Sequence, residues 1–348
     1  MNARTCGGEL PASKEIGLIR AANHSSYPRV GDHPLDQQLR HAQKARDRGE
    51  ATDAQVAEVE DEVTGIVVAE QSRAFVDIVT DGAVRWEGPL SHVARHLDGL
   101  AAHDLVRWFE TNFYDRRPEA IGPIRRRAPF LVHDYEVAAA VAQAKPVKMV
   151  LPGPVSFARL SKDRHYGSVE AFSRGLADAF AEEVADLSAA GCRHFQIDEP
   201  MLCRRPEDLD LVAETAGRVF AAAGSGATTV LSTYFGDLTS LAGALHRLPG
   251  THLGLDMVWG RGNWELLAEV PDGKGVHLGL FDARTTRQED ASDVAEQLLP
   301  YKDVLTRRDV IVGPQAGLEL LPRDQAFEKL LHARYLVEEL SREWTWAS

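Results

Sequence analysis

Two adjacent carboxylates, Asp198 and Glu199, end an apolar segment and are followed at once by Pro200. The segment Phe195-Gln196-Ile197 is typical of a buried strand, and a proline ends a strand because it has no N–H to donate. Paired acids at a strand exit can bind an ammonium group or act as general acid and base. The same residues also favour an ordinary polar turn, so the remainder of the chain must decide between the two interpretations.

Strands alternate with helices along most of the chain. Apolar segments predict eight strands, near residues 17, 78, 149, 196, 230, 254, 279 and 311. Helical periodicity covers residues 36–50, 52–71, 169–190, 209–223, 238–248, 294–299 and 323–343. Eight βα units predict the α/β class and a (β/α)8 TIM barrel, with an open doubly wound sheet as the alternative. The absence of a Gly-x-Gly-x-x-Gly turn after any strand argues against dinucleotide binding by such an open sheet.

The predicted domain organisation is simple. Residues 1–348 are expected to form one barrel domain, with a core over about residues 16–340 and an N-terminal extension before it. Residues 104–135 carry aromatic and basic side chains without clear periodicity, and they are predicted to be an irregular insertion.

In a barrel, the residues that follow the strands share one rim, however far apart they lie in the sequence. The candidates are mostly polar side chains after the predicted strands: Ser25, Ser26, Asp81, Asp198, Glu199, Tyr234, Asp237, Asp256, Asp282, Arg284 and Gln315. Crowded carboxylates in a concave site have shifted pKa values and can bind cations or transfer protons. An aspartate after a strand can instead cap the next helix, and for Asp237 and Asp282 both roles stay open.

The composition predicts a soluble cytoplasmic protein that acts on small molecules. The chain has 52 acidic residues against 39 Lys and Arg, and this negative balance disfavours nucleic acid as a partner. Three cysteines without a Cys-x-x-Cys pair indicate neither a disulfide framework nor a closed thiolate zinc site. No segment reaches the ~18 consecutive apolar residues of a membrane helix, and the first residues do not form a signal peptide. The oligomeric state stays open.

The histidines and the basic run at 125–127 do not predict further sites. His194, His252 and His277 lie in predicted strands without His-x-His or His-Glu-x-x-His spacing, so we expect hydrogen-bonded core histidines and no metal site. The three arginines at 125–127 are suited to an anionic tail such as polyglutamate, but a solvated loop is the simpler expectation.

The motifs at the strand exits resemble, in order, those of the cobalamin-independent methionine synthase family. They are Ser25-Ser26-Tyr27-Pro28-Arg29, Asp77-Ile78-Val79-Thr80-Asp81-Gly82, Trp108-Phe109-Glu110-Thr111-Asn112-Phe113-Tyr114, Gly153-Pro154-Val155-Ser156-Phe157, Gln196-Ile197-Asp198-Glu199-Pro200, Ser232-Thr233-Tyr234-Phe235-Gly236-Asp237 and Gly313-Pro314-Gln315-Ala316-Gly317-Leu318. The resemblance implies methyl transfer from a 5-methyltetrahydrofolate on a (β/α) barrel. Full-length members have two related barrels, so this chain resembles a free-standing single-barrel relative.

The departures from the family pattern concern its zinc and its acceptor. The positions corresponding to the family's zinc ligands are Ser232, Tyr234, Asp256 and Ala316. Only Asp256 among them can still ligate a metal, and zinc serves the family by holding the acceptor thiol as a thiolate. A glutamate that helps to hold the acceptor is replaced by Ala83, whereas Asp198, which matches the acid that grips the acceptor's amine, is kept. The resemblance therefore implies a group transferase with an acceptor other than homocysteine, and it argues against bound zinc.

The resemblance also suggests roles for the rim residues. Asp198 and Glu199 would position or deprotonate the acceptor, or protonate the donor's leaving nitrogen. Tyr234 and Trp259 would stack on a flat heterocycle. The expected substrate-binding residues are Ser25, Ser26, Asp81, Asp237, Asp256, Trp259, Asp282 and Gln315. Two alternatives stay open, a metal-free lyase or decarboxylase similar to uroporphyrinogen decarboxylase and a catalytically silent binding protein, because a fold alone does not choose among them.

Overall fold

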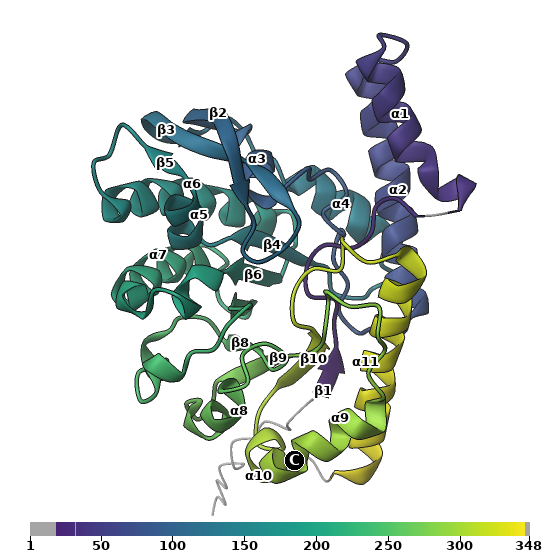
Figure 1. The fold of residues 1–348 in the computed structure, drawn as a ribbon, viewed down its shortest axis with the longest axis vertical. Helices are drawn as coiled ribbons and strands as arrows, with labels where there is room; N and C mark the ends of the chain where they lie inside the picture. The colour runs from purple at the N-terminus through teal and green to yellow at the C-terminus, as the bar shows by residue number, and fades with distance from the viewer. Residues whose placement is uncertain (1–18, 32, 345–348) are drawn as a thin grey trace, which may run out of the picture.

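A curled, seven-stranded parallel sheet forms the centre of the computed structural model, which describes residues 19–31 and 33–344 (Figure 1). The strands follow the order β1-β10-β9-β8-β7-β6-β4, and all neighbours are parallel. Their bounds are β1 (Ile19–Ala21), β4 (Lys148–Pro152), β6 (His194–Asp198), β7 (Thr228–Ser232), β8 (His252–Asp256), β9 (Gly275–Phe281) and β10 (Val310–Pro314). The α/β class is therefore confirmed. Part of the first predicted strand, at 16–18, lies outside the described residues.

The segment predicted as a strand near residue 78 does not form a regular strand. It lies between β1 and β4, where Ile78 makes an isolated parallel bridge with Ala22 and Val79 makes another with Val147. The backbone N–H of Lys148 donates to the carbonyl of Val79 over 2.8 Å. The segment near residue 78 is joined to its neighbours only by isolated bridges. The continuous sheet therefore has seven strands and forms a curled half-barrel.

Helices cover the outer face of this sheet (Figure 1). The α-helices are α1 (Gln38–Asp47), α2 (Asp53–Arg73), α3 (Pro89–Ala94), α4 (Val132–Val141), α5 (Pro154–Leu160), α6 (Val169–Ala189), α7 (Leu209–Ala221), α8 (Asn263–Leu266), α9 (Ala291–Leu298), α10 (Lys302–Leu305) and α11 (Arg323–Glu343). Local sequence sets their ends: Thr52 and Gln55 form a capping box at α2, and the Ser168 hydroxyl caps α6. Gly191 follows α6 with a φ of 106°, a conformation that glycine adopts without strain.

Residues 238–248 were predicted as one helix, and this prediction is wrong. The segment forms two short 3₁₀ helices, η4 (Thr239–Leu241) and η5 (Leu245–Arg247), separated by Gly243 at a φ of 76°. Leucines at 238, 241, 245 and 248 are all buried. Spacings of three and four residues are shared by α-helices and by successive 3₁₀ turns, so the apolar pattern alone does not separate them.

The predicted irregular insertion at 104–135 is instead a long β-hairpin with a helix after it. Strand β2 (Leu97–Arg107) pairs antiparallel with β3 (Tyr114–Arg126), and the short β5 (Lys162–Asp163) adds to β3 in parallel. Register shifts between Asp98 and Leu100, and again between Ala102 and Leu105, break the alternation of apolar and polar residues. A strand without a sustained period of two is hard to identify from sequence.

The basic run at 125–127 lies at the end of β3 and is only partly solvated. Arg126 forms ion pairs with Glu183 (2.8 Å) and Asp186 (2.5 Å) of α6, which joins the hairpin to the helical layer. Arg125 and Arg127 are exposed. Among the described residues, every helix is too short or too polar to cross a membrane.

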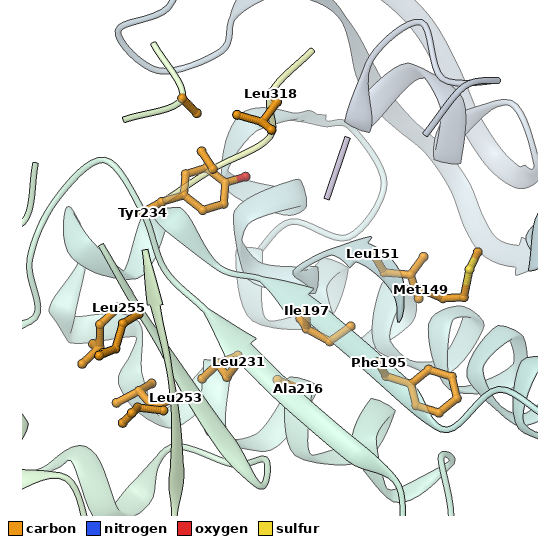
Figure 2. Close-up of a cluster of buried hydrophobic side chains, with 14 of the residues drawn as sticks. Met149, Leu151, Phe195, Ile197, Ala216, Leu231, Tyr234, Leu253, Leu255 and Leu318 are labelled. Carbon is orange, nitrogen blue, oxygen red and sulfur yellow. The ribbon is translucent and has the colours of Figure 1, made fainter. Parts of the chain in front are cut away.

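The strands divide the core into an apolar outer layer and a polar interior. Phe195 and Ile197 of β6 belong to the apolar cluster that Figure 2 shows, together with Met149, Leu231 and Leu253 of neighbouring strands and Ala216 of α7. Successive side chains of a strand point to opposite faces, so Gln196 and Asp198 face the interior of the curled sheet. This alternation directs polar residues toward the functional site.

Candidate functional site

A cavity of about 250 Å³ lies where the carboxyl ends of the strands meet. Its base and walls come from residues at the ends of β4 and β6 and from the segments after β1, β7, β9 and β10. The turn at 108–113 between β2 and β3 supplies another wall. Six of the candidate residues line the cavity: Ser25, Ser26, Asp81, Asp198, Tyr234 and Arg284.

Asp198 is the carboxylate at the base of the cavity. It is the last residue of β6, and the side-chain amide of Gln196 donates to its Oδ1 over 2.8 Å. Burial raises the pKa of Asp198 to about 7, while hydrogen bonds from Gln196 and Tyr234 and the charge of Lys148 act in the opposite direction. A carboxyl group that titrates near neutral pH can either bind a cation or hold a proton.

Glu199 follows directly but points elsewhere, and it is not among the residues that line the cavity. Its carboxylate accepts the backbone N–H groups of Val155 (2.9 Å) and Ser156 (2.8 Å) and the hydroxyl of Ser156 (2.7 Å). These donors form the first turn of α5, where a negative charge is favourable. A Cβ on Gly153 would lie 2.0 Å from the Glu199 carboxyl carbon, so only glycine permits this approach.

Four other predicted residues shape turns around the cavity without lining it. Asp256 accepts the backbone N–H groups of Phe235 (2.8 Å), Val258 (2.9 Å) and Trp259 (2.8 Å), and burial raises its pKa to about 6. The other three also accept backbone N–H groups. Asp237 accepts that of Thr239, and Asp282 accepts that of Arg284. The side chain of Gln315 accepts that of Ala283. Asp237 and Asp282 each accept the N–H two residues further on in a local turn, and neither caps the following helix, because the N-cap residues of η4 and α9 are Leu238 and Asp290.

Trp259 was predicted to stack on a ligand, but its ring lies outside the cavity lining and is 43% exposed. The guanidinium of Arg284 lies 4.8 Å from the centroid of this ring and 5.2 Å from that of Phe235. Arg284 and Phe235 line the cavity, so Trp259 supports the wall from behind.

Several lining residues were not predicted as site residues. Trp86, Trp108 and Phe113 form an aromatic wall, and Glu319 supplies a further carboxylate, which accepts a hydrogen bond from the Ser26 hydroxyl. The aromatic run at 108–114 was a visible signal, but its assignment to an irregular insertion separated it from the rim. Glu319 follows the last strand by several residues, and nothing in its local sequence distinguishes it from a surface glutamate.

The interior below the cavity contains a polar cluster that the sequence analysis also missed. His24 contacts the hydroxyls of Ser25 and Ser232 through its two ring nitrogens, each over 2.9 Å. Lys148, at the start of β4, donates to the Gln196 side-chain carbonyl over 2.6 Å. Burial, and then the charge of Lys148, lowers the pKa of His24 well below its ordinary value, so His24 is neutral.

Asp81 also lines the cavity, and its charge acts on the buried Asp134. Burial raises the pKa of Asp81 and of Asp134, and the charge of Asp81 raises that of Asp134 further. Arg85 opposes both shifts and lies 3.1 Å from the Asp134 carboxylate. Ala83, the residue that replaces a glutamate of the family motif, also lines the cavity and has a φ of 51°.

The positions that the resemblance matches to the family's zinc ligands are occupied by residues with other partners or with no donor atom. Both oxygens of Asp256 already accept backbone hydrogen bonds, and the Ser232 hydroxyl contacts His24. Tyr234 is buried with a pKa raised well above its ordinary value by burial and by Asp198, so its hydroxyl is protonated. Ala316 has no donor atom. Among residues 19–31 and 33–344, no group of three or more His, Cys, Asp or Glu side chains is arranged to hold a metal.

The three histidines of the strands have different surroundings. His252 contacts the Thr251 hydroxyl (2.9 Å) and Asp309 (3.2 Å), which confirms its prediction as a hydrogen-bonded core residue. His277 is buried and stacks on His24 at 5.7 Å between ring centroids. The Nε2 atoms of His194 and His277 have no hydrogen-bond partner within the described part of the chain.

Sequence comparisons identify related proteins. The family model described as "Cobalamin-independent synthase, N-terminal domain" matches residues 88–306. A methionine synthase of Saccharolobus solfataricus is 26% identical over 319 residues, which cover 90% of this chain and 95% of the relative. A methionine synthase of Sulfurisphaera tokodaii is 26% identical over 304 residues, which cover 87% of this chain and 88% of the relative.

Structural comparisons show that the fold is shared. A B12-independent methionine synthase from Shewanella sp. W3-18-1, solved in complex with selenomethionine, superposes with a TM-score of 0.79 at 20% identity, covering 94% of this chain and 99% of that one. A protein from Listeria monocytogenes described as a vitamin-B12-independent methionine synthase has a TM-score of 0.74 at 16% identity, with coverage of 94% and 99%.

Proposed function

The chain belongs to the cobalamin-independent methionine synthase family, and from that membership we propose that it is a methyl or related group transferase with a 5-methyltetrahydrofolate-type donor. The proposed acceptor is an amine-bearing small molecule other than homocysteine. The observation that carries the proposal is Asp198 at the base of an aromatic-walled cavity whose zinc-ligand positions are engaged in other bonds.

Asp198 is the proposed binding group for the acceptor's amine. An ammonium group at the base of the cavity would pair with this buried carboxylate, and such charge-assisted hydrogen bonds are the stronger kind. The hydroxyls of Ser25 and Ser26 line the same cavity and would orient the acceptor. The Shewanella relative, solved with the amino acid selenomethionine, supports an amine-bearing ligand of amino-acid size.

The flat donor would lie against the aromatic wall of Trp86, Trp108 and Phe113, because a heterocycle gains dispersion contacts on such rings. This replaces the predicted stacking on Trp259, which lies behind the wall. Tyr234 remains a proposed contact beside Asp198. In the family, zinc would hold a thiol acceptor as a thiolate. Because Ser232, Tyr234 and Asp256 have other partners here, we propose an acceptor that reacts without zinc.

In the proposed reaction, a nucleophilic atom of the acceptor forms a bond to the donor's methyl carbon while the carbon–nitrogen bond of the donor breaks. The acceptor loses one proton and the leaving nitrogen gains one, so the exchange is balanced. Asp198, with a pKa of about 7, is placed to hold that proton between the two steps. Glu199 has no part in this step because its carboxylate is committed to α5.

We also propose the finer architecture expected from the sequence. The segment near residue 78, bridged on both sides, would complete a (β/α)8 barrel of one domain over residues 1–348. A cytoplasmic location remains part of the proposal.

Thermal unfolding with 5-methyltetrahydrofolate, together with metal analysis of the purified protein, tests the proposed function. A ligand at 100 times its Kd stabilises the folded state by about 2.7 kcal/mol, so donor binding should raise Tm measurably. No stabilisation by the donor would favour the lyase or the silent binding protein. Stoichiometric zinc together with homocysteine binding would overturn the proposed acceptor class.

A further inference from the structure

A buried lysine lies directly below the cavity, in the interior of the sheet. Lys148 is 1% exposed, and lysine is almost never fully buried unless it is paired. Its side chain does not line the cavity. Its ammonium donates to the side-chain carbonyl of Gln196 over 2.6 Å. The proposed function assigns it no role, so the reason for burying this charge needs another explanation.

The chemistry of the ammonium fixes the orientation of the neighbouring amide. An ammonium can only donate hydrogen bonds, so it must face the oxygen of the Gln196 side chain and not its nitrogen. The amide nitrogen therefore points away from Lys148. It donates to Oδ1 of Asp198 over 2.8 Å and lies 3.3 Å from Nε2 of His24. Lys148 and Asp198 thus face opposite ends of one amide group.

Lys148 is the cation whose charge favours the ionised form of Asp198. Burial, with a smaller effect of Lys148, lowers the pKa values of His24 and His277, so both rings are neutral. His194 of β6 likewise has a pKa lowered to about 4, chiefly by burial. On the cavity side, Tyr234 stabilises the ionised form of Asp198 through a hydrogen bond, whereas Glu319 disfavours it.

We propose that Lys148 is a positioning residue for Asp198: its ammonium fixes the Gln196 amide, and charge and amide together keep the Asp198 carboxylate oriented and ionised at the base of the cavity. The inference rests on the proposed function in one respect, because that function makes Asp198 the group that binds the acceptor's amine. It adds a residue that touches neither ligand nor reacting atoms. Burial lowers the pKa of Lys148 to about 7, and the charge of Asp198 opposes this shift. The two charges therefore stabilise each other.

The titration of Asp198 tests this role without any ligand. Difference infrared spectroscopy across a pH series follows the carbonyl band of protonated carboxyl groups, and the band lost in Asp198→Asn identifies Asp198. In Lys148→Met, the midpoint should rise by about one pH unit, because an opposite charge nearby favours the carboxylate. Lys145→Met is the matched control: Lys145 donates to the Val76 carbonyl over 2.7 Å in the segment before β4, and its loss should leave the midpoint unchanged.

A second variant keeps the test decisive if Lys148→Met does not fold. Lys148→Gln removes the charge and keeps an N–H donor on a polar side chain, so the same upward shift is expected. A midpoint unchanged or lowered in a folded Lys148 variant would overturn the inference. Failure of 5-methyltetrahydrofolate to stabilise the wild-type protein would sink the proposed function alone, since the infrared titration does not depend on the donor.

Discussion

Asp198 at the base of the cavity and Glu199 against the first turn of α5 are adjacent in sequence, but their surroundings differ. Asp198 accepts a side-chain amide and is open to the cavity, whereas Glu199 accepts two backbone N–H groups and a hydroxyl in a fully enclosed site. Burial raises the pKa of each carboxyl group to about 7. A shifted pKa therefore does not identify the functional carboxylate; the partners of its oxygens do.

The largest expected effect is on stability, from Glu199→Ala. This change leaves buried donors of Val155 and Ser156 without their acceptor, and we expect a loss of about 3 kcal/mol in the free energy of unfolding. Urea denaturation followed by circular dichroism measures it. Asp237→Ala, at an exposed turn, serves as the control and should cost about 1 kcal/mol or less. A stable Glu199→Ala protein with impaired ligand binding would reverse the assignment of the two carboxylates.

Asp198→Asn should have the opposite profile, with binding lost and stability kept. Replacing the carboxylate by a neutral amide removes the charge that would hold an ammonium group, and we expect about 100-fold weaker binding of the probe L-methionine. Isothermal titration calorimetry gives the Kd, and the urea midpoint checks the fold. Trp259→Phe, behind the cavity wall, is the control and should bind the probe within about twofold of wild type. Unchanged affinity in Asp198→Asn would remove its proposed role.

The smallest expected effect is the pH dependence of ligand affinity, which should follow the ionisation of Asp198. Because burial raises the pKa of Asp198 to about 7, its carboxylate is protonated below that pH and ionised above it. Affinity for L-methionine should therefore rise as pH increases through 7, and it should change about tenfold per pH unit on the acid side. Calorimetry between pH 5.5 and about 8.5 measures this. In Asp198→Asn the dependence should be absent; an affinity that falls with rising pH would contradict the charge assignment.

Much of the fold follows from local patterns, and much of the site does not. Helix α11 at 323–343 has the predicted bounds, and strand β8 at 252–256 is centred on the predicted residue 254, because both segments have sustained apolar patterns. The β2–β3 hairpin was missed because its bulges interrupt the alternation. At the rim, Asp198 and Asp256 each end a strand and look alike in sequence. Asp256 accepts nearby backbone N–H groups and holds a turn, whereas Asp198 faces the cavity; this difference depends on the three-dimensional position of those N–H groups.

Residues far from the predicted rim were missed for a related physical reason. The function of Lys148 depends on its pairing with Gln196 across two neighbouring strands, and no spacing within one segment encodes that contact. Glu319 likewise reaches the cavity through its contact with Ser26 and not through a motif of its own.

The hairpin that closes one wall of the cavity also bears on how this family can diversify. Trp108, Thr111 and Phe113 come from the turn of a hairpin whose strands pair with each other and with β5, outside the seven-stranded sheet. Insertions or substitutions there can resize the binding volume while the parallel strands keep their register. The scaffold and the ligand preference can thus evolve on separate parts of the chain.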